Sequence, residues 1–160
     1  MRISLFAVGR LKTGPEKELA SRYHDRFAKA GPAVGLELSK QIEIQESRAS
    51  NADTRKREEA GALEKVLPEG AVLILLDERG KALDSEAFAG TIGRYRDSGK
   101  RDLMLAIGGA DGLDPDLRER ADMVLNLGSM TWPHQLVRIL IAEQLYRAVT
   151  ILSGHPYHRA

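Results

Sequence analysis

Short apolar segments follow one another along the chain, and polar segments separate them. The continuous apolar runs at residues 71–76 and 103–107 are typical of strands that are covered on both faces. Residues 36–44 instead alternate between apolar and polar side chains, as half-buried strands do. The pattern predicts strands at residues 3–8, 36–44, 71–76, 103–107 and 123–126.

Between these strands, apolar side chains recur at the spacing of an α-helix. In residues 15–30, Leu19, Tyr23 and Phe27 lie four residues apart on one side. Because strands alternate with helices throughout, the sequence predicts an α/β fold with a mostly parallel sheet and helices on both faces. Further helices are predicted from a cap at Asn51 or Asp53 to about residue 67, at 85–97, at about 115–121, and from Pro133 to about residue 152.

The predicted C-terminal helix has two unusual features. Ser129 or Thr131 is its expected N-cap, and Pro133 suits the first turn, where its missing N–H is not needed. Its apolar positions cover more than one face, which predicts a core face and a subunit interface. A short tail follows at residues 155–160, and we expect it to reach a functional site, in its own subunit or in a partner.

Composition limits the classes to which the protein can belong. A length of 160 residues fits one domain, residues 1–160, with a core of its own. The net charge of +1 gives no strongly basic character that would indicate nucleic-acid binding, and the absence of cysteine excludes disulfides and thiolate metal sites. No apolar run has the roughly 20 residues of a membrane span, so we expect a cytoplasmic protein with no membrane partner.

Three predicted strands end in loops of unusual composition. These loops begin at residues 76–77, at Gly108 with Gly109, and at residues 127–132. Ligands of parallel α/β sheets bind beyond the carboxyl ends of the strands, so the three loops predict one pocket. The two glycines would let the backbone approach a planar ligand, and a tight turn before Gly112 explains them equally well. A nicotinamide-dependent oxidoreductase is an alternative that lacks its usual G-x-G-x-x-G motif here.

Histidines gather near the C-terminus, but not in a metal-binding pattern. No carboxylate or third ligand accompanies them at a fixed spacing, so we expect no metal site. We interpret His134 as a helix-start residue and His155 as a conformational residue. His158, between Tyr157 and Arg159 in a tail too short to form core, is the candidate functional imidazole.

Several of these motifs together resemble one family of enzymes. They are the Gly-Gly-Ala-Asp-Gly of residues 108–112, the Leu-Gly-Ser-Met-Thr-Trp-Pro-His of residues 127–134, and the His-Pro-Tyr-His-Arg of residues 155–159. Further matches near residues 7–9 and 76–81 extend the likeness over the whole chain. The sequence resembles the ribosomal RNA large subunit methyltransferase H family, within the SPOUT methyltransferases.

This resemblance implies an architecture and an activity. It implies a homodimer whose C-terminal part is threaded into a deep trefoil knot, a feature that no periodicity predicts. It also implies methyl transfer from S-adenosyl-L-methionine to N3 of a pseudouridine in helix 69 of large-subunit (23S) rRNA, within the assembled 70S ribosome. Tyr157, His158 and Arg159 match the tail that serves substrate binding and catalysis. The candidate cofactor contacts are Leu76, Gly108, Gly109, Leu127, Gly128, Ser129, Met130, Thr131 and Trp132.

The chemistry of such a transfer suggests roles for the tail. The ring N3 carries a proton and is nucleophilic only without it, so a base is required. We expect His158 to take the proton, Arg159 to stabilise the developing charge or bind a phosphate, and Tyr157 to stack on or hydrogen-bond the base. We interpret Arg138 and Arg147 as structural residues or phosphate contacts.

The low net charge restricts how such a protein binds RNA. Non-specific affinity increases with the number of neutralised phosphates, so basic residues must gather on one face or ribosomal proteins must contribute. The charged segment at residues 45–57 forms either a solvated face or a phosphate-facing patch. A non-catalytic ribosome-associated binding module is the alternative function, and cofactor affinity separates it from an enzyme. Other basic candidates are Arg10, Lys12, Arg22, Arg26 and Lys29.

Overall fold

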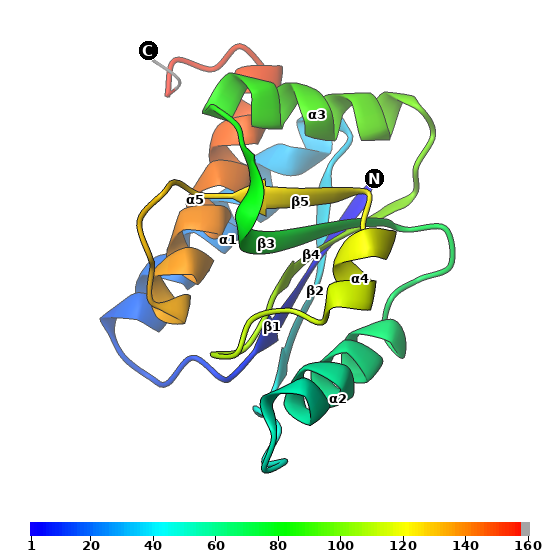
Figure 1. Cartoon of the computed structure of the whole chain (residues 1–160). Coiled ribbons are helices and arrows are strands. Elements are labelled where there is room, and N and C mark those ends of the chain that lie inside the picture. Colours follow the sequence, from blue (N-terminus) through cyan, green and yellow to red (C-terminus); the bar gives the residue numbers. More distant parts are fainter. Residues whose placement is uncertain (158–160) are drawn as a thin grey trace.

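The chain forms a β-sheet that is flanked by helices (Figure 1). The computed structural model describes residues 1–157. The strands are β1 (Arg2–Val8), β2 (Glu37–Ile44), β3 (Val72–Ala82), β4 (Asp102–Ile107) and β5 (Met123–Asn126). The helices are α1 (Pro15–Ala30), η1 (Gly31–Val34, a short 3₁₀ helix), α2 (Ala52–Glu64), α3 (Ser85–Asp97), α4 (Pro115–Arg120) and α5 (His134–Leu152).

The sheet has the order β2-β1-β4-β3-β5, and each pair of neighbouring strands is parallel. The predicted α/β fold with a parallel sheet is therefore confirmed. Because β4, β3 and β5 are neighbours, their carboxyl ends share one edge of the sheet. The trefoil knot that the family resemblance implies stays a prediction.

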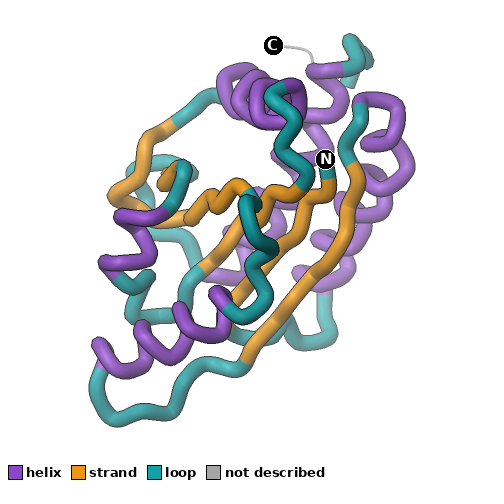
Figure 2. Tube along the Cα trace, turned by 90° about the vertical axis from the view of Figure 1, so that its right-hand side faces the viewer, coloured by secondary structure: helices purple, strands orange, loops and turns teal. Residues whose placement is uncertain are grey.

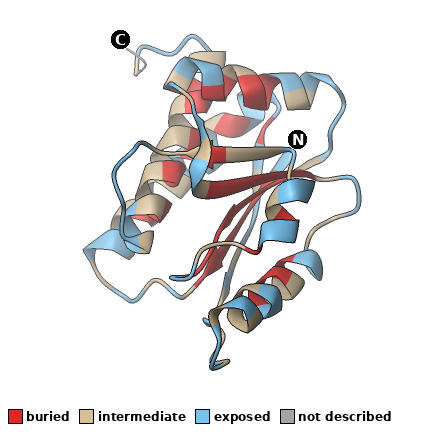
Figure 3. Cartoon of the chain, viewed as in Figure 1, coloured by how far each residue is buried: buried red, intermediate tan, exposed pale blue. Residues whose placement is uncertain are grey.

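Alternate side chains of the strands enter two separate cores. The buried residues lie in the strands and in the helices beside them (Figure 3). In β1, Ile3, Leu5 and Ala7 pack in the core that α1, α3 and α5 cover. Phe6 and Val8 point to the opposite face, where they pack with α2 and α4. The side view shows helices on both sides of the strands (Figure 2). The prediction of helices on both faces is therefore confirmed.

One predicted boundary is wrong, because the third strand does not end at Leu76. β3 continues beyond this residue, and its register against β5 shifts so that Leu76 and Lys81 both pair with Leu125. Gly80 permits this close passage, since a Cβ atom there would lie 2.6 Å from the Val124 carbonyl oxygen. The apolar run marks only the first half of the strand, because the second half is mostly exposed.

The start of α5 also differs from the prediction. Pro133 occupies the N-cap position instead of the first turn, and no side chain of residues 1–157 caps the helix, so neither Ser129 nor Thr131 does. The Pro133 carbonyl instead accepts hydrogen bonds from the N–H groups of Leu136 and Val137, at 2.9 and 3.1 Å. A side-chain cap must adjoin the first helical residue, and the two hydroxyls lie too early in the loop to do so.

α5 buries one side in the core and leaves apolar side chains on another. Ile141 and Leu145 are each 1% exposed, whereas Leu136 is 39% exposed. The predicted core face of this helix is confirmed, and its subunit interface stays a prediction. Although α5 is the longest of the described helices, neither it nor another helix in residues 1–157 combines the length and hydropathy needed to cross a membrane.

Candidate functional site

Residues 76–79 of β3 and the loops that follow β4 and β5 surround one cavity, here named the strand-end pocket. It has a volume of about 200 Å³ and borders the first turn of α5. The three segments predicted to converge do line one cavity, but residues 76–77 belong to β3 and do not begin a loop. The ligand of the cavity stays a prediction. Ser129 is not among the residues that line the cavity. The other predicted cofactor residues all line the cavity: Leu76, Gly108, Gly109, Leu127, Gly128, Met130, Thr131 and Trp132.

The strand-end pocket has apolar walls and an acidic side. Leu76 contributes to the walls, and Asp77 with Glu78 adds two carboxylates from the polar half of β3. Met130 and Trp132 also line the pocket and are 71% and 38% exposed. Large exposed apolar side chains beside a cavity indicate a binding surface. The sequence marked the end of the apolar run but not the two carboxylates, because they belong to a strand that continues.

Asn126 fixes the loop that leaves β5. Its side-chain amide donates to the Glu78 carbonyl oxygen at 2.6 Å, and its Oδ1 accepts from the Gly128 N–H at 2.7 Å. On the facing strand, Asp77 accepts from the Arg79 N–H at 2.9 Å. Sequence reasoning missed Asn126, since a single amide at a strand end has no characteristic spacing.

The turn at residues 108–112 needs its glycines for packing. A Cβ atom on Gly109 would lie 2.9 Å from Oε2 of Glu59 and 3.1 Å from Cγ1 of Val8. Gly112 has a φ of +83°, and its N–H donates to the Gly109 carbonyl at 3.0 Å. The tight-turn interpretation is therefore confirmed. Gly108 and Gly109 also line the pocket, and the close approach of a planar ligand to them stays a prediction.

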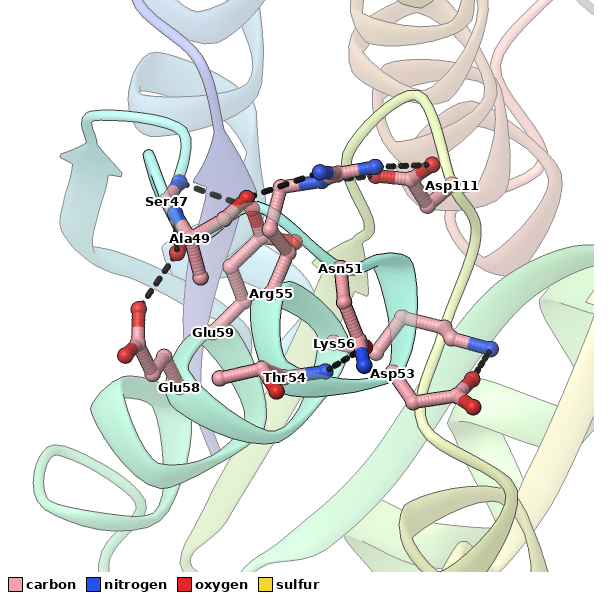
Figure 4. Close-up of polar contacts among 10 residues, drawn as sticks. All are labelled: Ser47, Ala49, Asn51, Asp53, Thr54, Arg55, Lys56, Glu58, Glu59 and Asp111. Carbon is pink, nitrogen blue, oxygen red and sulfur yellow. Dashed lines mark hydrogen bonds and ion pairs between the residues drawn. The ribbon is translucent and has the colours of Figure 1, made fainter.

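Helix α2 holds the turn at residues 108–112 in place through hydrogen bonds to Asp111 (Figure 4). Arg55 donates from Nε and Nη2 to the Asp111 carboxylate at 2.6 and 2.9 Å, and from Nη1 to the Ala49 carbonyl at 2.8 Å. Lys56 pairs with Asp53 at 2.8 Å. These cations bind groups of the protein itself, which favours a structural role for the charged segment over a phosphate-facing patch.

Glu59 is a buried carboxylate beside the same turn. It is 8% exposed, and its Oε1 accepts from the Ser47 backbone N–H at 3.0 Å. Burial raises the pKa of Glu59; the Ser47 N–H and Arg55 oppose this effect, and the carboxylates of Glu46 and Asp111 add to it. Sequence reasoning missed Glu59, because nothing in the pattern separates it from the exposed acidic residues of α2.

Arg138 joins α5 to the carboxyl end of β1. It is 7% exposed, and its Nη2 donates to the carbonyls of Val8 and Gly9 at 2.9 and 2.5 Å. Its Nη1 donates to Oε1 of Glu43 at 2.5 Å. Burial lowers the pKa of Arg138, and Glu43 offsets part of that effect. These contacts support the structural interpretation of Arg138.

Tyr157 docks against the middle of α5. Its hydroxyl lies 3.3 Å from Oε1 of Glu143, its ring centroid lies 4.9 Å from that of Tyr146, and the Arg147 guanidinium lies 5.2 Å from its ring. Burial and the Glu143 carboxylate raise the pKa of Tyr157 to about 12. Residues 153–157 follow the C-terminal end of α5, whereas the loop that lines the pocket precedes its start (Figure 1). Within one chain, Tyr157 therefore does not line the strand-end pocket.

The remaining predicted residues differ in their placement. His158 and Arg159 lie outside the described residues. His134 begins α5, as predicted, and lines the strand-end pocket. Nδ1 of His155 accepts from the Tyr157 N–H at 3.1 Å, which agrees with a conformational role. In the part of the chain that the structure describes, no three His, Cys, Asp or Glu side chains are grouped to hold a metal ion.

Comparison with known proteins assigns the chain to a family. The family model described as "Predicted SPOUT methyltransferase" matches residues 1–158, so the chain belongs to the SPOUT methyltransferases. Among its relatives is the "Ribosomal RNA large subunit methyltransferase H" of Rhizobium meliloti (strain 1021), which is 81% identical over 160 residues and 100% of both chains. The protein of the same name from Agrobacterium fabrum (strain C58 / ATCC 33970) is 76% identical over 159 residues and 99% of both chains. The resemblance found in the sequence is therefore confirmed.

A solved structure supports the fold. It is described as a probable methylase family protein from Haemophilus influenzae Rd KW20, and it matches with a TM-score of 0.55 at 11% identity. The match covers 99% of this chain and 70% of the other. At this identity the likeness concerns the fold alone.

Proposed function

We propose that this protein methylates large-subunit rRNA and takes the methyl group from S-adenosyl-L-methionine. The meeting of β3 with the loops after β4 and β5 around one pocket, in a SPOUT methyltransferase chain, carries the proposal. Full-length relatives at 76% and 81% identity carry the name of that activity. We further propose that the acceptor is N3 of a pseudouridine in helix 69 of 23S rRNA in the assembled 70S ribosome, on the basis of the family resemblance.

The residues of the strand-end pocket fit an adenosyl sulfonium compound. Leu76, Leu127 and Trp132 offer apolar surface to an adenine ring, and the glycine turn offers backbone groups without side chains. The Glu78 carboxylate complements a positive sulfonium charge, whereas Asp77 is already paired with Arg118 at 3.8 Å. When bound, such a donor supplies an activated methyl group. It carries no phosphate, so the pocket needs no phosphate-binding loop.

The size of the pocket favours a site that two copies complete. Ligand sites usually have volumes of about 300–1,000 Å³, and the strand-end pocket has about 200 Å³. Met130 and Trp132 remain exposed beside it, and Leu136 is exposed on the first turn of α5. We propose that a second copy covers these side chains in a homodimer. Tyr157 contacts Glu143 of its own chain and does not line the strand-end pocket of that chain. We therefore propose that each pocket is closed by the tail of the partner.

In the proposed reaction, the tail handles the proton of the acceptor. The N3–H bond breaks and its proton moves to the His158 imidazole, while an N3–methyl bond forms and the sulfur–methyl bond breaks. Arg159 stabilises the negative charge that develops on the ring, and Tyr157 stacks on it. Holding both reactants in line supplies on the order of 7–11 kcal/mol in the best cases.

Mass spectrometry of rRNA tests the proposed function. Ribosomes that lack the modification are incubated with the protein and S-adenosyl-L-methionine, and free 23S rRNA serves as a second substrate. We expect one new methyl group on a pseudouridine of helix 69, with ribosomes as the better substrate. Binding to ribosomes without methylation and without cofactor affinity would instead identify a non-catalytic binding module. Fluorescence of added NADPH tests the oxidoreductase alternative.

A further inference from the structure

A second cavity lies between α1, the β1–β2 pair and α5. Its volume is about 440 Å³, against about 200 Å³ for the strand-end pocket. Ile107 lines both cavities, so the two adjoin each other. We name this cavity the α1 pocket. Neither the proposed methyl donor nor the proposed tail uses it.

The interior of the α1 pocket is apolar. Leu5 and Ala7 of β1, Ala20 of α1, Ile107 of β4 and Ile141 of α5 all line it, and each is at most 9% exposed. An apolar floor of this kind favours a flat, largely apolar ring over a strongly hydrated ion. The cavity is therefore suited to a ring compound.

Polar groups with unused hydrogen-bonding capacity border this floor. His24 and Arg138 both line the cavity. Nε2 of His24 and Nε of Arg138 are buried and have no hydrogen-bond partner among the described residues. Burial lowers the pKa of His24, and Asp25 and Gln41 offset this only in part, which favours a neutral ring. A neutral imidazole and a guanidinium N–H together recognise a ligand edge that carries both donors and acceptors.

The mouth of the α1 pocket is basic. Arg10 and Lys17 line it, and both are exposed. Neither forms a salt bridge with another described residue, unlike Arg55 and Lys56 in the charged segment. Unpaired cations at the mouth of an apolar cavity suit a ring that is attached to a phosphate. A nucleotide combines these properties: an apolar ring face, a polar ring edge and an anionic group.

We propose that the α1 pocket receives one unstacked base of the RNA substrate, close to the base that is methylated, with an adjoining phosphate on Arg10 and Lys17. This inference rests on the proposed function and adds to it a second base-binding site. Sequence-specific recognition of RNA commonly uses single bases that leave the stack and enter protein pockets. Because the two pockets adjoin at Ile107, a base in the α1 pocket lies near the methyl donor, and one strand can supply both this base and the base that is methylated.

Two variants test the α1 pocket without touching the strand-end pocket. Ser21→Trp places a large side chain at an exposed position of the lining, and Lys17→Ala removes one cation of the mouth. Lys100→Ala is the matched control, because Lys100 is exposed, lines neither cavity and is not among the basic candidates for RNA binding. The measurements are kcat/KM with unmodified ribosomes, the salt dependence of ribosome binding, and the Kd of S-adenosyl-L-methionine. Circular dichroism confirms that each variant is folded.

We expect Ser21→Trp to lower kcat/KM about tenfold or more, as the loss of one bound base does, with the cofactor Kd unchanged. Lys17→Ala should reduce the slope of log affinity against log salt by about 0.7, the value for one phosphate of a single strand. Lys100→Ala should change neither quantity. Ultraviolet crosslinking to ribosomes should attach nucleotides to peptides that contain His24 or Gln41.

Wild-type kcat/KM in a folded Ser21→Trp variant would overturn the assignment, even if the protein methylates rRNA as proposed. If Ser21→Trp does not fold, an unchanged salt slope for Lys17→Ala together with no crosslink at the cavity would overturn it instead. A small anionic metabolite as the true ligand would produce that result. A wild-type protein that fails to methylate rRNA would overturn the proposed function and this assignment together, so the two failures are distinguishable.

Discussion

Arg55 binds Asp111 through two parallel hydrogen bonds, at 2.6 and 2.9 Å, across 56 positions of sequence. This pair connects helix α2 to the glycine turn that lines the strand-end pocket. The same guanidinium also donates to the Ala49 carbonyl, so it joins the loop before α2 to the turn. A bidentate pair fixes direction as well as distance. A segment outside the pocket therefore determines how the pocket backbone is presented.

Arg55→Ala should weaken cofactor binding without unfolding the protein. Release of Asp111 would let the glycine turn move, and small misplacements near a ligand have large effects, so we expect a Kd for S-adenosyl-L-methionine roughly three to ten times higher. Calorimetric titration measures this change. Arg120→Ala is the matched control, because it removes an ion pair with Glu64 that does not touch the turn. An equal effect of both substitutions would contradict a specific role for Arg55.

Two glycine substitutions in neighbouring elements should change stability in opposite directions. In Gly109→Ala, the new methyl group meets Glu59 at 2.9 Å and Val8 at 3.1 Å, so we expect a loss of about 1–3 kcal/mol. Gly61 lies within α2, and a Cβ atom there would meet no atom of residues 1–157 within 4 Å, so Gly61→Ala should add about 0.5–1 kcal/mol. Urea denaturation measures both. Equal stability of the two variants would show that the turn relaxes freely.

The convergence of the strand-end loops could be predicted from the sequence because it follows from topology. Once β3, β4 and β5 are recognised as parallel neighbours, Leu76 at the end of the apolar run of β3 must lie at the same side of the sheet as Gly108 and Leu127, which follow β4 and β5. The sequence did not predict the polar half of β3, because this half is stabilised by pairing with a neighbouring strand and not by an apolar pattern of its own. Its pairing with Leu125 arises from a neighbour in the sheet, and no alternation in residues 77–82 indicates it.

The positions of Glu59 and Tyr157 could not be predicted from the sequence, because they depend on how helices, strands and the tail pack against one another. Glu59 lies beside Gly109 only because α2 crosses that face of the sheet at this position. Tyr157 docks on Tyr146 and Glu143 through stacking and one hydrogen bond, and a short tail has no periodic pattern that would indicate this. The sequence provided candidates for the residues that carry the chemistry, whereas the residues that position them required the structure.

Glu59 should make stability depend on pH in an unusual direction for a carboxylate. Burial raises the pKa of Glu59 in the folded protein, so the folded state binds the proton more tightly than the unfolded chain does. Its contribution to stability is greatest below the unfolded pKa of about 4.3 and declines as the pH rises through the folded pKa. Glu59→Gln keeps an oxygen that can accept from Ser47, so it should raise Tm at pH 7 and leave it nearly unchanged at pH 4.

Thermal unfolding between pH 4 and pH 8 measures the difference between the two proteins. A lower Tm for Glu59→Gln at every pH would show that the ionised carboxylate makes a favourable contact. In that case the interaction with Arg55 would outweigh the cost of burial, which is the reverse of the order inferred here.

Arg138 and Arg147 lie on the same helix and should differ in their effect on stability. Arg138 is 7% exposed and binds Glu43 and two backbone carbonyls, so Arg138→Met should cost on the order of 3 kcal/mol. Arg147 binds Glu143 one turn away on a partly exposed surface, so Arg147→Met should cost less than about 0.5 kcal/mol. Chemical denaturation measures both. Similar losses for the two would mean that the buried guanidinium contributes no more than a surface pair.

Mixed dimers should reveal which pocket the C-terminal tail serves. One chain is truncated after residue 156 and keeps its strand-end pocket; the other keeps its tail and carries Thr131→Trp, which fills the pocket from an exposed lining position. Each variant alone should be inactive on ribosomes.

If the tail closes the partner's pocket, the mixed dimer contains one complete site, because the intact pocket of the first chain meets the intact tail of the second. Activity should therefore return on mixing and subunit exchange. A tail that serves its own chain leaves both sites of the mixed dimer incomplete, so a mixture that stays inactive after demonstrated exchange would contradict the proposed arrangement.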